Sequence, residues 1–343
     1  MKWSLIVLTV PFLGVTWALT QRRIELAARV GAVITLATVA TGVASTFEDV
    51  NEGIAGVEVR RDHTATVTSF GTGRDKRLLV NGVGITFLSP ITKIMAHLPL
   101  LALSRPAESS LVICFGMGTT FRSLLSWGID VTAVELVPSV RDAFGFYFAD
   151  ASDVMANPNG TIVIDDGRRF LKRNEKQFDV ITLDPPPPVE AAGSSLLYSR
   201  EFYRDAKARL RPGGVLQQWF PRGERRILES IIAALAESFQ HVRIFHSVED
   251  YGFHFLASDQ PIEIPTPAEA VLKLPEAAKR DLLEWYPGGD VLEILRKILS
   301  REVALKELLR NGGPRSLSDD RPYNEYYLLR RLVSGPGGVE HIR

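Results

Sequence analysis

The sequence predicts an α/β protein built on a parallel, doubly wound sheet. Two observations predict this fold class. Residues 110–135 read as a strand, a glycine turn, a short helix and a second strand that ends on Glu135. The alternation of β-rich runs with helical segments then continues to about Asp259. Strands separated by helices in this way form parallel sheets with right-handed crossovers.

Seven runs in this region have the length and composition of strands. The first two are Leu111–Phe115 and Val131–Val134, joined through a helix expected at Thr119–Trp127. The other five are Thr161–Asp165, Phe178–Asp184, Val215–Trp219, Val242–His246 and Phe253–Ala257. In an open α/β sheet a crevice forms at the carboxyl ends of the strands, and a nucleotide-like ligand can bind there.

The turn after the first strand carries two glycines around a methionine, Gly116-Met117-Gly118. A dinucleotide-binding turn has a third glycine three residues later, where this chain has Phe121, and this disfavours NAD. The departure fits a nucleoside that lacks a pyrophosphate, such as an S-adenosyl compound. Glu135, at the end of the second strand, is placed to accept hydrogen bonds from both ribose hydroxyls. The alternative is a turn whose glycines serve packing alone.

The composition is that of a globular chain with balanced charge. Of 343 residues, 45% are hydrophobic and 23% are charged, and the formal net charge is zero, so nothing favours a nucleic acid as partner. The single cysteine, Cys114, excludes an internal disulfide and a thiolate metal cluster, and fits a reducing compartment. We interpret Cys114 as a packing residue rather than a nucleophile. The histidines show no metal-ligand spacing, and we predict no metal site.

Residues 1–45 differ from the rest of the chain. Trp3–Thr20 carries no charge over 18 residues and Val30–Ser45 none over 16, with Gln21-Arg22-Arg23 between them. These lengths predict two transmembrane helices in a hairpin. A signal peptide is the alternative for the first run, and a buried soluble helix for the second. The arginines favour a cytoplasmic connection, whereas Lys2 and the cytosolic origin of the expected co-substrate favour a cytoplasmic catalytic domain, which is the orientation we predict.

Two further regions flank the predicted nucleoside-binding domain, residues 110–260. Residues 46–109 form a small β-hairpin domain and a linking helix, and residues 261–343 form a C-terminal helical extension. In the first region we expect strands at Val57–Arg60, Ala65–Phe70 and Lys76–Val80, a tight turn at Asn81-Gly82 and a helix at Thr92–Leu103. In the last region we expect helices at Ala268–Leu274, Glu276–Trp285 and Val291–Asn311.

Carboxylates end two more of the predicted strands. The third strand leads into Asp165-Asp166-Gly167, where Asp166 is placed to hydrogen-bond the exocyclic amine of an adenine or to cap the next helix. The fourth strand leads into Asp184, which is followed by four prolines that fix its direction. A carboxylate in this position can take a proton from an attacking amine, or stabilise the ammonium as it forms. A cap or turn acid is the alternative.

At these residues the chain resembles the spermidine synthase family, the polyamine aminopropyltransferases, and most closely the bacterial branch in which that domain is fused to a membrane segment. The resemblance runs from about Val57 to Asp259, with an echo at Ser318–Tyr326. It rests on LVNG at 79–82, HLPLL at 97–101, FGMG at 115–118, VEL at 134–136, IDDGRRF at 164–170, DVITLDPPPP at 179–188, EFY at 201–203 and LRPGGV at 210–215.

The resemblance implies a fold, an activity and a location. The fold is a small N-terminal β-domain followed by a seven-stranded, methyltransferase-type (Rossmann-like) sheet, and the assembly is a homodimer. The activity is transfer of an aminopropyl group from decarboxylated S-adenosylmethionine to an amine. The location is the bacterial inner membrane.

The resemblance also implies roles for single residues. Glu135 matches the family's ribose-binding glutamate, Asp166 its adenine-binding aspartate and Asp184 the aspartate that deprotonates the attacking amine. The predicted nucleoside site is completed by Gly116, Met117, Gly118, Asp165 and Gly167. Glu190 and Tyr251 are the predicted acceptor-binding residues, with Tyr251 and Trp219 alternatively packed in the core.

Several positions depart from the family pattern. Met117 replaces the aspartate that holds the aminopropyl ammonium, and Pro187 replaces a second aspartate after Asp184. Ile91, Thr92 and Lys93 replace a Tyr-His-Glu run that helps bind the polyamine. An ammonium is costly to desolvate in a crevice that lacks carboxylates. The nucleoside half of the site is kept, and the polyamine half is largely lost.

Three functions remain open from the sequence. The first is aminopropyl transfer with an altered acceptor site, and the second is methyl transfer from S-adenosylmethionine to a small molecule. The third is a catalytically silent ligand-binding or assembly module on a membrane protein. The joint presence of Glu135, Asp166 and Asp184 argues against the third function. Pro187 stands where amino-group methyltransferases of nucleic acids have an aromatic residue, which argues against a nucleic-acid substrate.

Overall fold

The computed structural model describes residues 56–185, 189, 193–221, 223–309 and 315–326. The chain divides into two compact units, residues 1–59 and residues 60–343. Within the described ranges, no helix combines the length and the apolar character needed to cross a membrane. The two transmembrane helices that we expect at residues 1–45 lie outside these ranges.

A small four-stranded sheet comes first along the described chain. Its order is β1 (Glu58–Arg61), β2 (Thr66–Phe70), β3 (Arg77–Val80) and β4 (Val83–Phe87), with the 3-10 helix η1 (Gly73–Asp75) between β2 and β3. β3 is antiparallel to both β2 and β4. Asn81 and Gly82 have φ of 51° and 78°, as a two-residue hairpin turn of type I′ requires. The predicted turn is therefore present, and the strand that follows it, β4, is one that we did not predict.

The helix α4 (Pro90–Leu101) joins this sheet to the main domain. It begins two residues earlier than predicted, because Ser89 caps it by accepting a hydrogen bond of 3.2 Å from the Ile91 N–H. A proline at the first helical position suits this start, since its missing N–H has no partner within the helix. Nearly every residue of α4 is buried.

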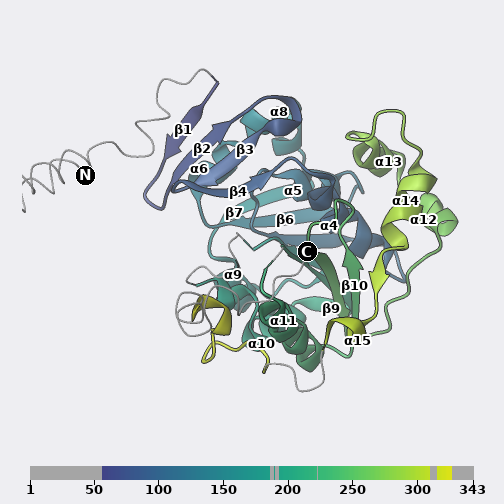
Figure 1. Cartoon of the computed structure of the whole chain (residues 1–343). Helices are drawn as coiled ribbons and strands as arrows, with labels where there is room; N and C mark the ends of the chain where they lie inside the picture. Colours follow the sequence, from purple (N-terminus) through teal and green to yellow (C-terminus); the bar gives the residue numbers. More distant parts are fainter. Residues whose placement is uncertain (1–55, 186–188, 190–192, 222, 310–314, 327–343) are drawn as a thin grey trace, which may run out of the picture. The chain divides into compact units, whose positions relative to one another are not determined.

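The main domain contains an eight-stranded mixed sheet in the order β12-β10-β11-β9-β8-β5-β6-β7 (Figure 1). The strands β9, β8, β5, β6 and β7 are parallel, and β11 runs antiparallel to both β9 and β10. The predicted parallel sheet is therefore mixed, with its antiparallel strands at this end. The strand bounds are β5 (Ser109–Ile113), β6 (Asp130–Glu135), β7 (Gly160–Ile164), β8 (Phe178–Leu183), β9 (Leu210–Phe220), β10 (His241–His246), β11 (Phe253–Ser258) and β12 (Glu302–Val303).

Helices cover both faces of this sheet. Val112 belongs to one apolar core, together with residues of α4 and α5, whereas its neighbours Leu111 and Ile113 belong to a second core with residues of α9, α10 and α11. Strands buried on both faces carry continuous apolar runs, as β8 does. The helices of this region are α5 (Thr119–Leu125), α6 (Pro138–Asp142), α7 (Phe144–Tyr147), α8 (Ala151–Met155), α9 (Gly167–Arg173), α10 (Arg200–Lys207) and α11 (Arg225–Ser238).

The C-terminal extension corrects one prediction. We expected a single helix at Val291–Asn311. Instead, α14 (Val291–Leu299) ends at Leu299 and is followed by β12 and by α15 (Leu305–Leu308). β12 pairs with the exposed edge strand β10, where Val303 faces Ile244, and it makes the sheet eight-stranded rather than seven-stranded. Covering an edge strand satisfies its unpaired backbone groups. The remaining helices are α12 (Pro267–Lys273) and α13 (Glu276–Leu283), close to their predicted positions.

Candidate active site

The parallel strands β5, β6, β7 and β8 have their carboxyl ends side by side, at one edge of the sheet. Ile113 of β5 pairs with Val134 of β6 and with Leu183 of β8. The next residue of several strands continues the ladder: the N–H groups of Cys114, Asp165 and Asp184 donate to the carbonyls of Val134, Glu135 and Ile113. The glycine turn, Glu135, the Asp165-Asp166 pair and Asp184 therefore lie side by side, as the sequence predicts.

A cavity of about 590 Å³ opens at this edge. Five residues of the predicted site line it, namely Gly116, Glu135, Asp166, Gly167 and Asp184. Apolar side chains of the small sheet, of β5 and of the turn after β6 form much of the remaining wall, including Leu78, Val80, Ile113, Leu136 and Val137. A cavity of this size with a few polar groups fits a ligand of nucleoside dimensions.

Glu135 is buried and is held by the backbone around it. One carboxylate oxygen accepts hydrogen bonds from the N–H groups of Phe115 at 2.9 Å and Gly116 at 3.4 Å, and the other accepts from Val137 at 2.9 Å. Burial raises the pKa of Glu135 above its ordinary value, and these backbone N–H groups oppose the rise. Each carboxylate oxygen has further lone pairs, so Glu135 can accept hydrogen bonds from two neighbouring hydroxyl groups as well.

The residues of the glycine turn have different surroundings. Gly116, with φ of 56°, lines the cavity, and a Cβ there would have no atom closer than 3.8 Å. Gly118 does not line it: a Cβ there would lie 2.5 Å from the Phe144 ring, so this glycine allows close packing. Met117 is only 3% exposed and belongs to the apolar core. Of the three, Gly116 alone is placed to contact a ligand in this cavity.

Cys114 is a residue that sequence reasoning placed inside the first strand. In the structure β5 ends at Ile113, directly before Cys114. Cys114 has a positive φ of 71° and lines the cavity. Burial raises the pKa of its thiol well above the usual value, and the nearby carboxylates of Glu135, Asp184 and Asp166 add to this shift. The thiol therefore stays protonated, which agrees with a packing residue and not with a nucleophile.

Asp165, Asp166 and Gly167 each have a different role. Asp166 caps α9 by accepting a hydrogen bond of 2.7 Å from the Arg169 N–H, and it also lines the cavity. The two interpretations of Asp166 are thus compatible, because a carboxylate has a second oxygen. Asp165 pairs with the Arg169 side chain and does not line the cavity. A Cβ at Gly167 would lie 2.4 Å from Ile113, so this glycine lets α9 approach β5.

Asp184 has the most perturbed carboxylate of the site. Burial raises its pKa from 3.8 to about 7. One of its oxygens is buried and accepts no hydrogen bond from any residue that the structure describes. A carboxylate with a pKa near neutrality is suited to proton transfer, because it is present in both protonation states at the working pH.

A second cavity, of about 430 Å³, also reaches Asp184. The two cavities share Leu78, Thr86 and Asp184 in their walls. Trp219 and Tyr251 line the second cavity, and their ring centroids lie 5.9 Å apart. Glu190, the other predicted acceptor residue, lies outside the described ranges. Asp184 therefore lines both the nucleoside-sized cavity and a second, adjoining cavity.

Residues 193–197 close the first cavity and were missed by sequence reasoning. Gly193, Ser194, Leu196 and Leu197 line it, mostly from the 3-10 helix η2 (Ser194–Leu197). The C-terminal segment 315–326, which contains the 3-10 helix η3 (Tyr323–Tyr326), holds this part in place. Asn324 donates to Ser194, and Glu325 accepts from the Ser195 N–H at 3.1 Å. The resemblance of Ser318–Tyr326 to the family was the one sequence feature that could have indicated this contact.

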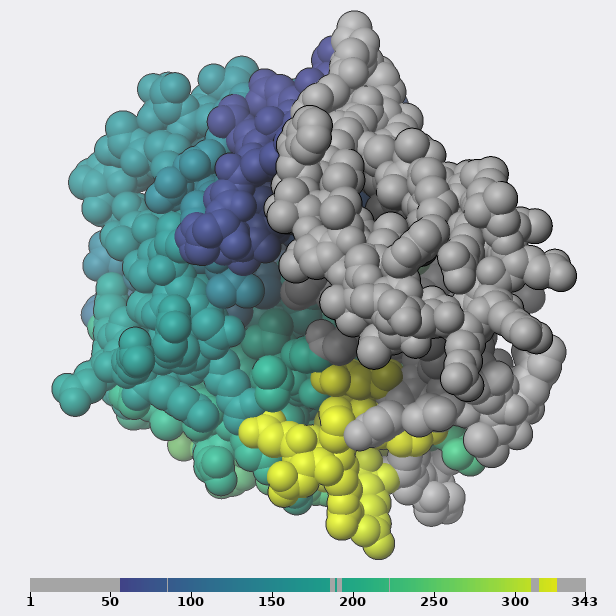
Figure 2. All heavy atoms as spheres, turned by 90° about the vertical axis from the view of Figure 1, so that its left-hand side faces the viewer, coloured from purple at the N-terminus to yellow at the C-terminus, as the bar shows by residue number. Residues whose placement is uncertain are grey.

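The same C-terminal segment also contacts α9 and α10. Arg168, another residue of the cavity wall, donates to Asp319 at 2.9 Å, and the Asp319 N–H donates to Glu201 at 3.0 Å. Figure 1 shows η3 beside α9 and α10, and in Figure 2 the segment, in yellow, lies at the surface against teal residues. The Arg168 guanidinium is thus already paired and does not act as an unpaired cation in the cavity.

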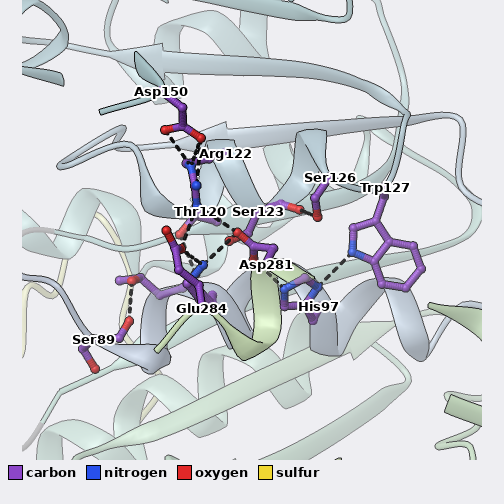
Figure 3. A network of polar contacts seen from close by, with 12 residues as sticks. Ser89, His97, Thr120, Arg122, Ser123, Ser126, Trp127, Asp150, Asp281 and Glu284 are labelled. Atoms are coloured by element: carbon purple, nitrogen blue, oxygen red, sulfur yellow. Dashed lines mark hydrogen bonds and ion pairs between the residues drawn. The ribbon is translucent and has the colours of Figure 1, made fainter. Parts of the chain in front are cut away.

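A buried network of charges anchors α4, whose first residues line the second cavity (Figure 3). Lys93, with 0% exposure, donates to Asp281 and Glu284 of the α13 region, each at 2.7 Å. Arg122 of α5 donates to the same two carboxylates at 3.2 and 2.8 Å. Although burial raises the pKa of Asp281, hydrogen bonds from His97 and Lys93 hold it below its ordinary value.

His97 is fixed in one tautomer by this network. The Trp127 indole N–H donates to His97 Nδ1 at 2.9 Å, so Nδ1 must be the acceptor. The ring proton is then on Nε2, which donates to Asp281 at 2.9 Å. His97 is therefore a structural residue that ties α4 to Trp127 and Asp281. Among the described residues, no group of three or more metal-ligating side chains is arranged to hold a metal ion.

Comparison with known proteins identifies the domain that carries this site. Residues 89–248 match the family described as the spermine/spermidine synthase domain. This domain belongs to the spermidine synthase family. Among the curated relatives, the polyamine aminopropyltransferase 2 of Hyperthermus butylicus is 31% identical over 199 residues, which are 55% of this chain and 65% of that protein. The polyamine aminopropyltransferase of Leptospira biflexa is 34% identical over 126 residues, 36% of this chain and 44% of that protein. The chain thus spans less than two thirds of each of these relatives.

Solved structures show the same spermidine synthase fold. A crystal structure of a spermidine synthase in complex with the transition state analogue AdoDATO has a TM-score of 0.52 at 17% identity, and covers 66% of this chain and 88% of its own. The spermidine synthase from Thermotoga maritima has a TM-score of 0.51, also at 17% identity, over 66% of this chain and 87% of its own. The predicted methyltransferase-type α/β fold is confirmed, in its mixed-sheet form.

Proposed function

We propose that this protein transfers an aminopropyl group from decarboxylated S-adenosylmethionine to a primary amine. The observation that carries the proposal is the position of Asp184, which lines both the nucleoside-sized cavity and the second cavity. A transferase of this kind needs its proton acceptor where the two substrates meet. The names of the relatives, polyamine aminopropyltransferases, support the same reaction class.

The reaction balances with the groups at this site. The nitrogen of the acceptor amine forms a bond to the carbon attached to the sulfonium sulfur of the donor. The bond between that carbon and sulfur breaks, and sulfur keeps the electron pair and leaves as a neutral thioether, 5′-methylthioadenosine. The amine loses one proton, and Asp184, with a pKa raised to about 7, is the group that accepts it. No further reactant is needed.

The nucleoside half of the donor fits the first cavity. Glu135 is aimed by three backbone N–H groups and can accept from the two ribose hydroxyls. Asp166 uses one oxygen to cap α9, and its other oxygen can accept from the exocyclic amine of adenine. The apolar side chains of Leu136, Val137 and Ile113 suit the faces of the base.

The charges of the first cavity favour the decarboxylated donor over S-adenosylmethionine. Among the described residues that line it, the charged ones are Glu135, Asp166, Asp184 and Arg168, and Arg168 is already paired with Asp319. An acidic cavity attracts a donor with a sulfonium and an ammonium, and it repels the additional carboxylate of S-adenosylmethionine. This acidic lining supports aminopropyl transfer although Met117 replaces the family's aspartate.

Product analysis tests the proposal. The purified full-length chain is incubated with each donor and a panel of primary amines, and the products are identified by mass spectrometry. Aminopropyl transfer releases 5′-methylthioadenosine and adds an aminopropyl group to the amine, and Glu135→Gln should weaken it. Release of S-adenosylhomocysteine from S-adenosylmethionine would instead support a methyltransferase. Release of neither product would support the catalytically silent module.

The location and assembly are also proposals. We propose that residues 1–45 anchor the protein in the bacterial inner membrane, that the catalytic domain faces the cytoplasm, where the co-substrate is made, and that the protein is a homodimer. The uncharged runs in these residues support the anchor. A reporter that is active on one side of the membrane only, fused after Arg343, tests the orientation, and light scattering of the detergent-solubilised chain tests the dimer.

A further inference from the structure

The second cavity provides little for a substrate with several positive charges. It is lined by residues of the small sheet, of the start of α4 and of the end of β9, together with Tyr251. Among the described residues in its wall, Asp184 is the only carboxylate and Arg77 the only basic side chain. A substrate with two or three ammonium groups needs a carboxylate or several oxygen atoms for each one that it buries. Asp184 is thus the one carboxylate of the described wall itself, and Glu249, behind the wall, already accepts a hydrogen bond of 2.6 Å from Ser89.

Arg77 makes a second ammonium unfavourable. Its guanidinium is exposed and lies 4.9 Å from the centroid of the Phe87 ring, and no carboxylate of the described part of the chain forms an ion pair with it. An unpaired guanidinium repels a cation and attracts an oxygen with negative charge. Arg77 is thus suited to an acceptor whose end opposite the reacting amine is neutral or anionic.

Aromatic and apolar side chains form most of the remaining wall. Phe70, Phe87, Trp219 and Tyr251 line the cavity, with Leu79 and Ile91. Phe87 and Tyr251 are 38% and 37% exposed, so part of this aromatic surface is open to water. Apolar surface that is open to water binds an apolar or aromatic body and gains free energy by covering it.

Trp219 adds a hydrogen-bond donor to this wall. Its indole nitrogen is buried and has no acceptor among the described residues. A buried donor without a partner is destabilising, and a ligand oxygen that accepts from it removes this penalty. Trp219 therefore points to an acceptor substrate that carries an oxygen atom besides its amine.

We infer that the acceptor is a primary monoamine with an aromatic or apolar body and an oxygen atom, and not a diamine or polyamine. The inference deepens the proposed function and rests on it. The amine meets Asp184, the body covers Trp219, Tyr251 and Phe87, and the oxygen accepts from Trp219 or Arg77. Tyramine has all three features, phenethylamine lacks the oxygen, and putrescine lacks the aromatic body and has a second ammonium.

The test compares these three amines with the full-length chain and decarboxylated S-adenosylmethionine. Release of 5′-methylthioadenosine reports every transfer, whichever amine is used. We expect kcat/KM for tyramine to exceed that for putrescine about tenfold or more. Equal or faster reaction with putrescine would overturn the inference and leave the proposed function intact. If the protein binds the donor but releases no 5′-methylthioadenosine with any of the three amines, both the inference and the proposed function are contradicted.

Two variants test the residues. Arg77→Glu should shift the ratio of kcat/KM values toward putrescine by about tenfold, because it exchanges repulsion of the second ammonium for attraction. Arg173→Glu, at the exposed end of α9 and in the wall of neither cavity, is the matched control and should leave the ratio as it is. Trp219→Phe should lower the preference for tyramine over phenethylamine by about three- to tenfold. Unchanged ratios in both Arg77→Glu and Trp219→Phe would overturn the inference.

Discussion

The side-chain amide of Asn324 donates a hydrogen bond of 2.8 Å to the hydroxyl of Ser194. The same amide donates to the Val189 carbonyl at 2.6 Å, and Asn324 is completely buried. Ser194 lines the nucleoside-sized cavity, on the segment that follows Asp184 and the prolines. A residue near the C-terminal end of the described chain thus positions one wall of the candidate active site.

Asn324→Ala should therefore weaken donor binding. It removes two buried hydrogen bonds, one to the Val189 carbonyl and one to the Ser194 hydroxyl, and each bond of this kind contributes about 0.5–1.5 kcal/mol to stability. We expect the melting temperature to fall and the Kd for decarboxylated S-adenosylmethionine to rise about three- to tenfold, measured by calorimetry. Ser258→Ala is the control, since it loses a buried hydrogen bond of 2.8 Å to Gly214 outside both cavities. A Kd that stays at the wild-type value in both variants would show that Asn324 is structural only.

Asp184→Asn should stabilise the protein at high pH. Burial raises the pKa of Asp184 from 3.8 to about 7, so between these pH values the folded protein holds a proton that the unfolded chain has released. The ionised carboxylate thus costs stability as pH rises through this window, and the cost is complete above about pH 7. Each pKa unit corresponds to about 1.4 kcal/mol, so the gain for the variant is at most a few kcal/mol.

Urea unfolding at about pH 4 and pH 8 measures this difference. The variant should exceed the wild type in stability at the higher pH only, while its kcat falls by about 10²- to 10⁴-fold. The exposed Asp153→Asn is the control and should change neither quantity. A stability gain of equal size at both pH values would show that Asp184 is not a buried group with a raised pKa.

Asp166→Ala should separate helix capping from ligand binding. The variant loses the cap of α9, which costs about 1 kcal/mol of stability, and it loses the proposed contact with the adenine amine. Asp290→Ala is a matched control, because Asp290 caps α14 by accepting from the Glu293 N–H at 3.0 Å and lines neither cavity. Both variants should lose similar stability, and Asp166→Ala alone should raise the Kd of the donor. Equal Kd values for the two variants would contradict the adenine contact.

Lys93→Met should be strongly destabilising. It leaves the buried carboxylate of Asp281 and that of Glu284 without one of their cations, and breaking a buried charge pair costs about 3–5 kcal/mol. Lys279→Met removes a pair of 2.6 Å with the exposed Glu276 on α13 and should cost far less stability, because water screens an exposed ion pair. Thermal unfolding followed by circular dichroism compares them. Similar losses in the two variants would mean that the network does not anchor α4.

Much of the nucleoside cavity could be predicted from the sequence because its residues follow strands directly. An apolar run that ends in Gly116, Glu135, Asp166 or Asp184 fixes where these residues stand, since parallel strands end at one edge of the sheet. The finer roles depend on packing that spacing does not report. Gly118 and Gly167 accommodate Phe144 and Ile113, and Met117 points into the core.

Other parts of the fold depend on partners that are distant in the sequence. β12 forms because the edge strand β10 needs a neighbour, and periodicity alone predicts a continuing helix there. Asn324 reaches Ser194 across 130 residues, and Lys93 reaches Asp281 across 188. The second cavity is assembled from the small sheet, α4, β9 and Tyr251. The sequence indicated a loss of polar groups at Ile91, Thr92 and Lys93, but the set of residues that surrounds Asp184 is visible only in the structure.

The measurement that tests the central claim most directly is a calorimetric titration of the full-length chain with decarboxylated S-adenosylmethionine and, separately, with S-adenosylmethionine. The acidic cavity formed by Glu135, Asp166 and Asp184 should bind the decarboxylated compound about tenfold or more tightly. Tighter binding of S-adenosylmethionine would contradict aminopropyl transfer and favour a methyltransferase.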